Sequence, residues 1–247
     1  MQHYTNRQIF FAELIGTAFI LLFGNGVNAM VTLFNLGGYT NITFGWGIGV
    51  FLGILVSARI SGAHLNPAVT LALVVTKRTP ANKIPLYISA QMLGGFLGAL
   101  IVYIFFYAKF VEVDPLLAHS AGIFSTFPAI KDSFLPGFLA EVIATAVLMF
   151  GIFSIGDHFL HEKASFLAPF AVSALIVGIG MSFGAMHGYA MNPARDFSPR
   201  LLTAILGFKN NGLTDGSWVW AAPVFGSLLG APLGAWLYEL TILKRGK

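Results

Sequence analysis

The chain has 247 residues, of which 56% are hydrophobic and only 10% are charged, whereas a soluble domain usually carries about 25% charged residues. Such a small number of ionic groups cannot cover a water-facing surface. The composition therefore excludes an ordinary soluble protein and predicts an all-α membrane protein surrounded by lipid. The net charge of +4 could suggest nucleic acid, but the basic residues stand beside the ends of apolar segments, which is typical of membrane proteins, and we expect no nucleic-acid partner.

Long apolar runs, taken in chain order, predict six membrane-spanning helices. A helix of about 20 residues crosses the roughly 30 Å of hydrocarbon in a bilayer. The predicted spans are residues 10–34, 42–60, 84–108, 134–156, 165–186 and 217–243. Two shorter pieces, 61–76 and 188–206, follow the second and the fifth span and are too short to cross.

The two halves of the chain resemble each other. Residues 12–18 (AELIGTA) resemble residues 140–146 (AEVIATA), and each short piece holds an Asn-Pro-Ala triplet. Matches in the same order indicate an internal duplication. Because each copy has three spans, an odd number, the second enters the membrane from the opposite face, and the repeats are inverted. The predicted division of this single membrane domain, 1–247, is repeat one at about 8–108, an outer loop at 109–133 and repeat two at about 134–243.

Basic residues near the span ends set the expected orientation. The ends on the side of the two termini carry eight Lys and Arg residues, whereas the connections on the other side carry Lys109, Lys131 and Lys209. Because Lys and Arg accumulate on the cytoplasmic side, we expect an integral, multi-pass protein of the plasma membrane with cytoplasmic N- and C-termini.

Both Asn-Pro-Ala triplets have the residues of a helix start. Asn is a favoured N-cap and Pro is favoured at the first helical position, so Asn66 and Asn192 should begin helices that run to Lys77 and Leu206. At about 11 to 14 residues, or roughly 16–21 Å, each reaches halfway across a bilayer, so the two meet near the midplane. Their positive dipole ends repel cations there, and if each carboxamide oxygen caps its own helix, the NH₂ group remains free to donate into a pore.

The residues before each triplet, 61–65 and 187–191, are predicted to be non-helical. Such backbone cannot face lipid and must line a wet cavity, so its carbonyls should form a ladder of acceptors, with His64 and His187 as candidate lining residues.

Glu13 and Glu141 occupy matching positions deep in apolar helices. A carboxylate in such a place is a functional candidate, either as a proton relay or as an acceptor for the N–H groups of a re-entrant loop. The repeat-related positions favour the structural role.

Two stretches carry a resemblance to a known family. Residues 61–69 (SGAHLNPAV) and 188–197 (GYAMNPARDF) resemble the two signature loops of the aquaporin family, most strongly those of its glycerol-conducting branch. The similarity covers essentially the whole chain. It implies six tilted helices plus two re-entrant half-helices, a homotetramer with one pore per subunit, and passive passage of glycerol, water and similar small neutral solutes but not of protons or ions. It implies no enzymatic activity and no cofactor.

The resemblance also implies a narrow outer filter formed by Trp46, Gly180, Tyr189 and Arg195. Arg195 presents donors that bind hydroxyl oxygens and repel cations, and Trp46 supplies an apolar wall, a combination that suits a polyol. Gly180 stands where water-selective relatives usually have His and leaves more room. Tyr189 stands where bacterial glycerol facilitators usually have Phe. Its hydroxyl adds polarity and bulk, so a predominantly water-conducting channel with minor polyol permeability stays open as an alternative.

Other patterns have competing interpretations. Residues 180–184 match the G-x-S-x-G pattern of hydrolases, but small residues for helix packing explain them better inside a span. A coupled secondary transporter needs a titrating or ion-binding group at the midplane, which the two Asn residues do not supply. Asp196 and Arg200 resemble the glycerol-conducting branch and can also form an ordinary i,i+4 ion pair. A solvated loop explains the possible metal ligands Asp157, His158, His161 and Glu162 better than a metal site, and the chain has no cysteine.

Overall fold

The computed structural model describes residues 4–159 and 165–243, which form an all-helical bundle. The elements are α1 (Asn6–Phe34), α2 (Tyr39–Ser61), α3 (Pro67–Val75), η1 (Ala81–Lys83), α4 (Ile84–Val113), η2 (Ser120–Ile123), α5 (Phe134–Phe159), η3 (Ser165–Leu167), α6 (Ala168–Phe183), α7 (Pro193–Ile205) and α8 (Ala221–Thr241). Within these described residues, six helical stretches are long and apolar enough to cross a membrane: α1, α2, η1 with α4, α5, η3 with α6, and α8. The predicted all-α membrane fold is thereby confirmed.

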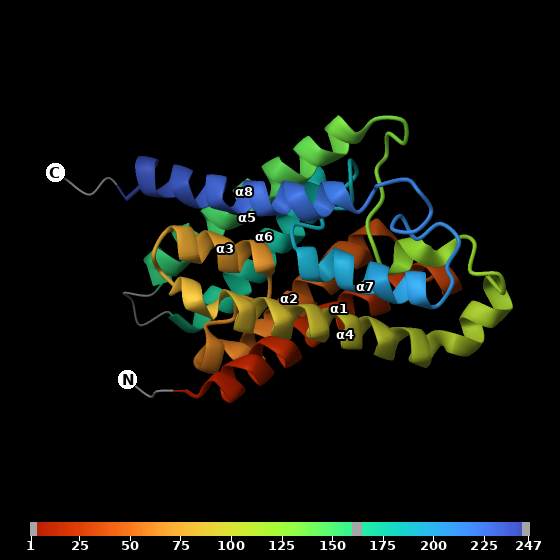
Figure 1. The fold of residues 1–247 in the computed structure, drawn as a ribbon, viewed down its shortest axis with the longest axis horizontal. Coiled ribbons are helices and arrows are strands. Elements are labelled where there is room, and N and C mark those ends of the chain that lie inside the picture. Colours follow the sequence, from red (N-terminus) through yellow and green to blue (C-terminus); the bar gives the residue numbers. More distant parts are fainter. Residues whose placement is uncertain (1–3, 160–164, 244–247) are drawn as a thin grey trace.

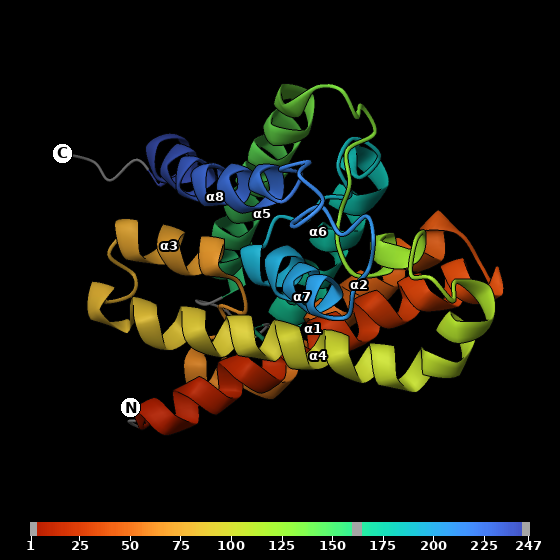
Figure 2. The same ribbon diagram turned by 45° about the vertical axis from the view of Figure 1, so that its right-hand side comes forward.

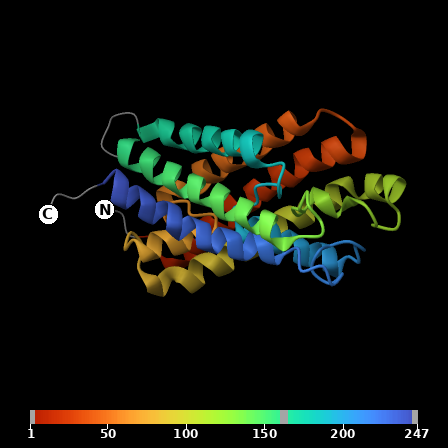
Figure 3. The ribbon, with the colours of Figure 1, turned by 90° about the horizontal axis from the view of Figure 1, so that it is seen from above.

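The two short helices α3 and α7 lie in the middle of the bundle with their N-terminal ends toward each other (Figure 1). Helices α1 and α4 lie on one side of this pair and α5 and α8 on the other, and the turned view keeps the same arrangement (Figure 2). Helix α1 begins and α8 ends at the same end of the bundle, which is also the end at which α3 finishes (Figures 1 and 3). The pair therefore fills the length of one span between the two halves of the chain.

Glycines set the closest helix contacts in both halves. A Cβ atom added to Gly98 of α4 would stand 2.5 Å from the carbonyl oxygen of Ala18 on α1, and one added to Gly234 of α8 would overlap the carbonyl oxygen of Ala146 on α5. Close approach of backbones through small residues is the usual way in which membrane helices associate. The contact of α1 with α4 thus recurs as that of α5 with α8.

Replacing Gly234 with Leu is expected to destabilise the protein by about 1–3 kcal/mol, the usual cost of overpacking, because the new side chain meets backbone that cannot move aside. The measurement is the thermal unfolding temperature of the purified protein in detergent. Gly178→Leu is the matched control, since a Cβ atom at Gly178 meets nothing within 4 Å. Equal unfolding temperatures for the two variants would contradict the predicted packing seam.

Helix α3 is shorter than predicted, with nine residues that end at Val75. Lys77 adopts a left-handed conformation (φ 60°), and the N–H groups of Arg78 and Thr79 return to the carbonyl oxygen of Leu73 at 2.8 and 3.0 Å. These bonds satisfy a carbonyl at the helix end and turn the chain toward η1, so the predicted continuation to Lys77 is wrong.

Helix α4 is longer than predicted, so the outer connection begins at Asp114 and not at residue 109. The charges of Lys109 and Glu112 suggested a water-exposed loop, but the two side chains pair along the helix, Nζ to Oε1 at 2.6 Å. Between them Phe110 is fully buried against Phe124 and Phe208. An aromatic packing site that the charge pattern does not reveal therefore extends the helix by about a turn.

Asp114 organises the start of the outer loop. Its carboxylate accepts hydrogen bonds from the backbone N–H groups of residues 118, 119 and 120 and from the hydroxyl of Ser120, at 2.7–2.9 Å. Burial by itself raises the pKa of Asp114, but these hydrogen bonds lower the pKa below its usual value. The carboxylate thus stays ionised and fixes the turn that leads into η2.

Candidate functional site

The two Asn-Pro-Ala triplets begin α3 and α7 as their residues predict. The Oδ1 atom of Asn66 accepts the N–H of Ala68 at 2.8 Å, and Oδ1 of Asn192 accepts those of Ala194 and Arg195 at 2.9 and 3.2 Å. Each carboxamide oxygen therefore caps its own helix, which fixes the side-chain orientation and leaves the NH₂ group to point elsewhere.

The two helix starts are bonded to each other across the centre of the protein. Asn66 Nδ2 donates to the carbonyl oxygen of Met191 at 2.8 Å, and Asn192 Nδ2 donates to the carbonyl oxygen of Leu65 at 2.9 Å. Because an amide carries two N–H donors, one hydrogen of each Asn remains for a solute. The prediction that both N–H groups of each Asn are free is therefore corrected to one. The carbonyl groups of Leu65 and Met191 accept these bonds, so they are not free acceptors in the predicted ladder.

Both re-entrant loops hold left-handed residues at corresponding positions. These are Gly62, Ala63 and Leu65 in the first loop and Gly188, Tyr189 and Met191 in the second, with φ between 41° and 83°. Two of the three in each loop are not glycine, and such residues cost about 1–3 kcal/mol each unless the surrounding structure holds them in place.

Two buried carboxylates hold these loops. Glu13 accepts the N–H groups of residues 64 and 65 at 2.9 and 2.7 Å, and Glu141 accepts those of residues 190 and 191, both at 2.8 Å. Both side chains are fully buried. Glu13 also accepts from Ser61 Oγ at 2.6 Å and from Gln91 Nε2 at 2.8 Å. Carboxylates committed to backbone donors match the scaffold role better than a proton relay.

A cavity of about 570 Å³ runs along the loops and the two Asn residues. Trp46 and Arg195 line one part of it, Asn66 and Asn192 another, and Arg78 lines the part beside the end of α3. Most of the remaining wall is apolar and includes Ile20, Val50, Ile54, Leu148, Ile152 and Ile176. The cavity wall therefore combines polar groups on the loops with apolar side chains of the surrounding helices.

The guanidinium of Arg195 stacks on the indole of Trp46, with Cζ 3.8 Å from the ring centroid. One of its nitrogens, NH1, donates to the carbonyl oxygen of Phe124 at 3.2 Å. Arg195 is 7% exposed and Trp46 4%. Arginine stacks on aromatic faces while its edge keeps several N–H donors, so the pair presents an apolar face beside a fork of donors.

Gly180 and Tyr189 lie against each other, a contact that the sequence did not predict, and Tyr189 is among the residues that line the cavity. A Cβ atom at Gly180 would stand 2.8 Å from Cζ of Tyr189 and 2.9 Å from Cγ2 of Thr43. The Tyr189 ring therefore fills the room that Gly180 was expected to leave for a solute. The Tyr189 hydroxyl is enclosed by protein and has no hydrogen-bond partner in the part of the chain that the structure describes, so it does not add polarity to the cavity.

Replacing Gly180 with His is expected to lower glycerol permeability by about tenfold, the factor that 1.4 kcal/mol produces, and to lower water permeability less. The imidazole has to push the Tyr189 ring toward the narrow part of the cavity, where a larger solute is excluded first. Water and glycerol fluxes into vesicles measure the two effects. The double variant Gly180→His/Tyr189→Ala should recover glycerol flux, and Gly178→His is the control in open space. Equal loss of both fluxes would refute the assignment.

The two candidate histidines lie in different places. His64 lines the cavity and stacks on Tyr87, with the ring centroids 4.1 Å apart. His187 is not among the residues that line this cavity; it is 1% exposed, and its Nδ1 atom lies 3.3 Å from Thr126 Oγ1 and 3.6 Å from Glu141 Oε1. The structure thus places His187 behind its loop, between α5 and the outer connection.

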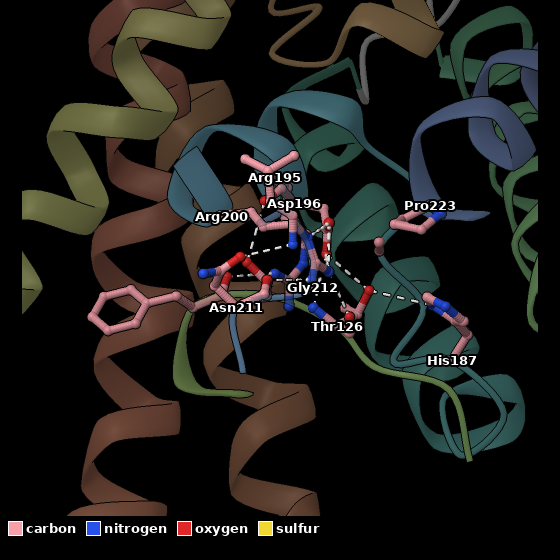
Figure 4. A network of polar contacts seen from close by, with 12 residues as sticks. Thr126, His187, Arg195, Asp196, Arg200, Asn211, Gly212 and Pro223 are labelled. Carbon is pink, nitrogen blue, oxygen red and sulfur yellow. Dashed lines mark hydrogen bonds and ion pairs between the residues drawn. The ribbon is translucent and has the colours of Figure 1, made fainter. Parts of the chain in front are cut away.

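A buried ion pair on α7 joins the half-helix to the outer connections (Figure 4). Arg200 Nε donates to Asp196 Oδ1 at 2.9 Å, and neither side chain is exposed. Asp196 Oδ2 accepts the N–H of Thr126 at 2.7 Å, while Arg200 donates to the carbonyl oxygens of Thr126 and Asn211 at 2.6 and 2.8 Å. The i,i+4 spacing predicted the pair, but nothing in the sequence pointed to Thr126 or Asn211. The sequence offered only a general signal: charged residues such as Asp196 and Arg200 within an apolar chain need polar partners where they are buried.

The patterns given other interpretations above stay outside this site. Ser182 lies inside α6 and not at a strand-to-helix elbow. Asp157 pairs with Arg78, Oδ1 to NH1 at 3.0 Å. Of the other possible metal ligands, His161 and Glu162 lie outside the residues that the structure describes. The described residues hold no group of three or more His, Asp and Glu side chains placed to bind a metal.

Comparisons with known proteins give the chain its family. The family model for major intrinsic proteins matches residues 1–238. The chain is 41% identical over 234 residues to the glycerol uptake facilitator protein of Bacillus subtilis, which covers 93% of this chain and 83% of the relative. It is 40% identical over 234 residues to the glycerol uptake facilitator protein of Streptococcus pneumoniae, which covers 93% of this chain and 97% of the relative.

The fold is similar to that of a solved relative. The X-ray structure of the aquaglyceroporin from Plasmodium falciparum superposes with a TM-score of 0.84 at 29% sequence identity, covering 97% of this chain and 98% of that one. A family match over nearly the whole chain, relatives of similar length and a common fold all agree with the paired half-helices described above, and the chain therefore belongs to the major intrinsic protein, or aquaporin, family.

Proposed function

We propose that this protein is a passive transmembrane channel for glycerol, water and similarly small neutral solutes that excludes protons and ions. The observation that carries the proposal is that one cavity is lined both by the two Asn caps and by the stacked pair of Trp46 and Arg195. The similarity of the chain to two glycerol uptake facilitators supports glycerol as a solute. Major intrinsic proteins are channels, so the protein is not an enzyme.

In this proposal the solute exchanges hydrogen bonds with one strip of the cavity wall. Asn66 and Asn192 each offer the amide hydrogen that the opposite loop does not use, and Arg195 offers the N–H groups that Phe124 does not occupy. The CH groups of a polyol lie against Trp46 and the aliphatic side chains. A cation meets the N-terminal dipole ends of α3 and α7 and the charge of Arg195, all of positive sign.

The proposal extends to assembly and orientation. The chain forms a homotetramer in the lipid of the plasma membrane, with one pore per subunit, as the resemblance implies. Both termini are cytoplasmic: α1 begins and α8 ends at one end of the bundle, and the span ends on that side carry eight of the Lys and Arg residues. This distribution is the positive-inside pattern.

A channel that conducts mainly water is the second candidate, and the packing of Tyr189 against Gly180 favours it. The ring takes space that a glycerol-sized solute would use, whereas water needs less. The two candidates share the same pore and differ only in the ratio of glycerol to water permeability.

The test is parallel measurement of water and glycerol flux into vesicles that contain the purified protein. We expect fast flux of both, driven by the solute gradient alone and unaffected by an imposed proton or sodium gradient. Glycerol flux that requires either ion gradient would indicate a coupled transporter and overturn the proposal. Fast water flux with little glycerol flux would select the second candidate.

A further inference from the structure

Trp46 is positioned from behind by helix α1. A Cβ atom at Gly24 would overlap the indole, so the ring lies flat against the α1 backbone at this point. One turn further along α1, Asn28 Oδ1 accepts the indole N–H of Trp46 at 3.3 Å. The glycine sets the plane of the ring and the asparagine sets its rotation within that plane.

Asn28 is bonded at the same time to the outer connection. Its Nδ2 atom donates to the carbonyl oxygen of Ile123 at 2.9 Å. The next carbonyl along the chain, that of Phe124, accepts from Arg195, and Arg195 stacks on Trp46. The contacts form a closed ring in which Asn28 holds Trp46 directly and Arg195 through one peptide unit.

Apolar packing around Ile123 and Phe124 holds this closed set of contacts in place. Ile123 and Phe124 are 1% and 0% exposed, in one apolar cluster with Ala29 and Leu33 of α1. Asn28 itself is buried and is not among the residues that line the cavity. Whatever Asn28 does for a solute, it does through the two filter side chains.

We propose that Asn28 is a positioning residue that holds Trp46 and Arg195 in their stacked arrangement, and so sets the size limit of the filter that these two side chains bound. The inference rests on the proposed function, in which these two side chains select the solute. Truncation of Asn28 leaves the indole N–H and the carbonyl of Ile123 buried without their partners, which is unfavourable for both groups. The indole and residues 120–126 then move so that the unpaired N–H and carbonyl groups find other hydrogen-bond partners, and the filter widens.

Asn25 provides a matched control on the same helix. It is fully buried, and neither its Oδ1 nor its Nδ2 has a hydrogen-bond partner among the residues that the structure describes. Replacing Asn25 therefore changes a buried amide of α1 without removing a hydrogen bond to Trp46 or to the outer connection. If α1 needed buried polar groups only for its structure, substitutions of Asn25 and of Asn28 would have the same effect on solute selection.

The first measurement is the permeability of vesicles to glycerol and to erythritol, a four-carbon polyol, for the wild-type protein and for Asn28→Ala, Asn28→Asp and Asn25→Leu. We expect Asn28→Ala to raise the erythritol-to-glycerol ratio by about fivefold, the factor that 1 kcal/mol corresponds to. Asn28→Asp keeps the acceptor for Trp46 but loses the donor to Ile123, so its ratio should lie between those of Asn28→Ala and the wild type. Asn25→Leu should keep the wild-type ratio.

The second measurement, amide hydrogen exchange of residues 120–126, does not depend on flux. Exchange should be faster in Asn28→Ala than in the wild type and in Asn25→Leu. An unchanged permeability ratio in folded Asn28→Ala, or exchange equal to that of Asn25→Leu, would overturn the proposal. If wild-type vesicles pass no glycerol, the proposed function fails, and the exchange comparison still decides whether Asn28 holds the outer connection.

Discussion

Replacing Arg195 with Ala is expected to raise proton and cation leak by about ten- to a hundredfold and to admit polyols larger than glycerol. A unit charge that passes roughly 4 Å from the guanidinium meets about 4 kcal/mol of repulsion at an effective dielectric constant of 20, and part of that barrier disappears with the side chain. The substitution also frees the Trp46 face and the carbonyl of Phe124. Proton conductance and solute swelling of the same vesicles measure both effects.

Arg195→Lys is the informative control for this experiment. The ammonium keeps the positive charge but cannot stack on Trp46 and bond Phe124 with one planar group. We therefore expect the Lys variant to exclude cations nearly as well as the wild type while it admits larger polyols. If the Ala variant leaks no more ions and selects solutes as the wild type does, Arg195 is not part of the filter.

Replacing Arg200 with Met is expected to destabilise the protein by about 3–5 kcal/mol, because it leaves the carboxylate of Asp196 buried without its ion pair. It also removes the bonds to the carbonyl oxygens of Thr126 and Asn211, so both outer connections lose their tie to α7. The measurement is the midpoint of thermal unfolding in detergent, together with the yield of folded protein.

Two comparisons separate the ion pair from a general loss of charge. Lys209→Met removes an exposed cation from the connection that follows α7 and should change stability by less than about 0.5 kcal/mol. The double variant Asp196→Leu/Arg200→Met removes both charges and should be more stable than Arg200→Met alone. A single variant as stable as Lys209→Met would contradict the structural role of the pair.

Local chemistry made much of this fold predictable. The apolar runs marked the six spans because a lipid-facing helix must be apolar along a fixed length. Asn66 and Asn192 marked the half-helices because capping involves only residues two or three positions apart. The helix ends were less accurate, because Phe110 extends α4 through burial against residues distant in sequence.

The candidate site was predictable only in part, since its precision comes from contacts between distant segments. The bonds of Asn28 to Ile123 and of Asp196 to Thr126 join positions 95 and 70 residues apart, and no spacing rule relates them. The sequence identified Tyr189 and Gly180 as site candidates but did not predict that they pack against each other. It identified His187 but did not predict that its side chain turns toward Glu141. The filter roles of Trp46, Gly180, Tyr189 and Arg195 stay predictions that the variants above test.

The reciprocal bonds of Asn66 with Met191 and of Asn192 with Leu65 join residues 125 and 127 positions apart in the chain. During synthesis the first half-helix therefore emerges long before the groups that complete its N-terminus. Closing so long a loop costs entropy that only the finished contacts offset. The centre of the protein therefore needs both halves of the chain, and a chain cut between α4 and α5 has no complete conduction path in either fragment until the two halves associate.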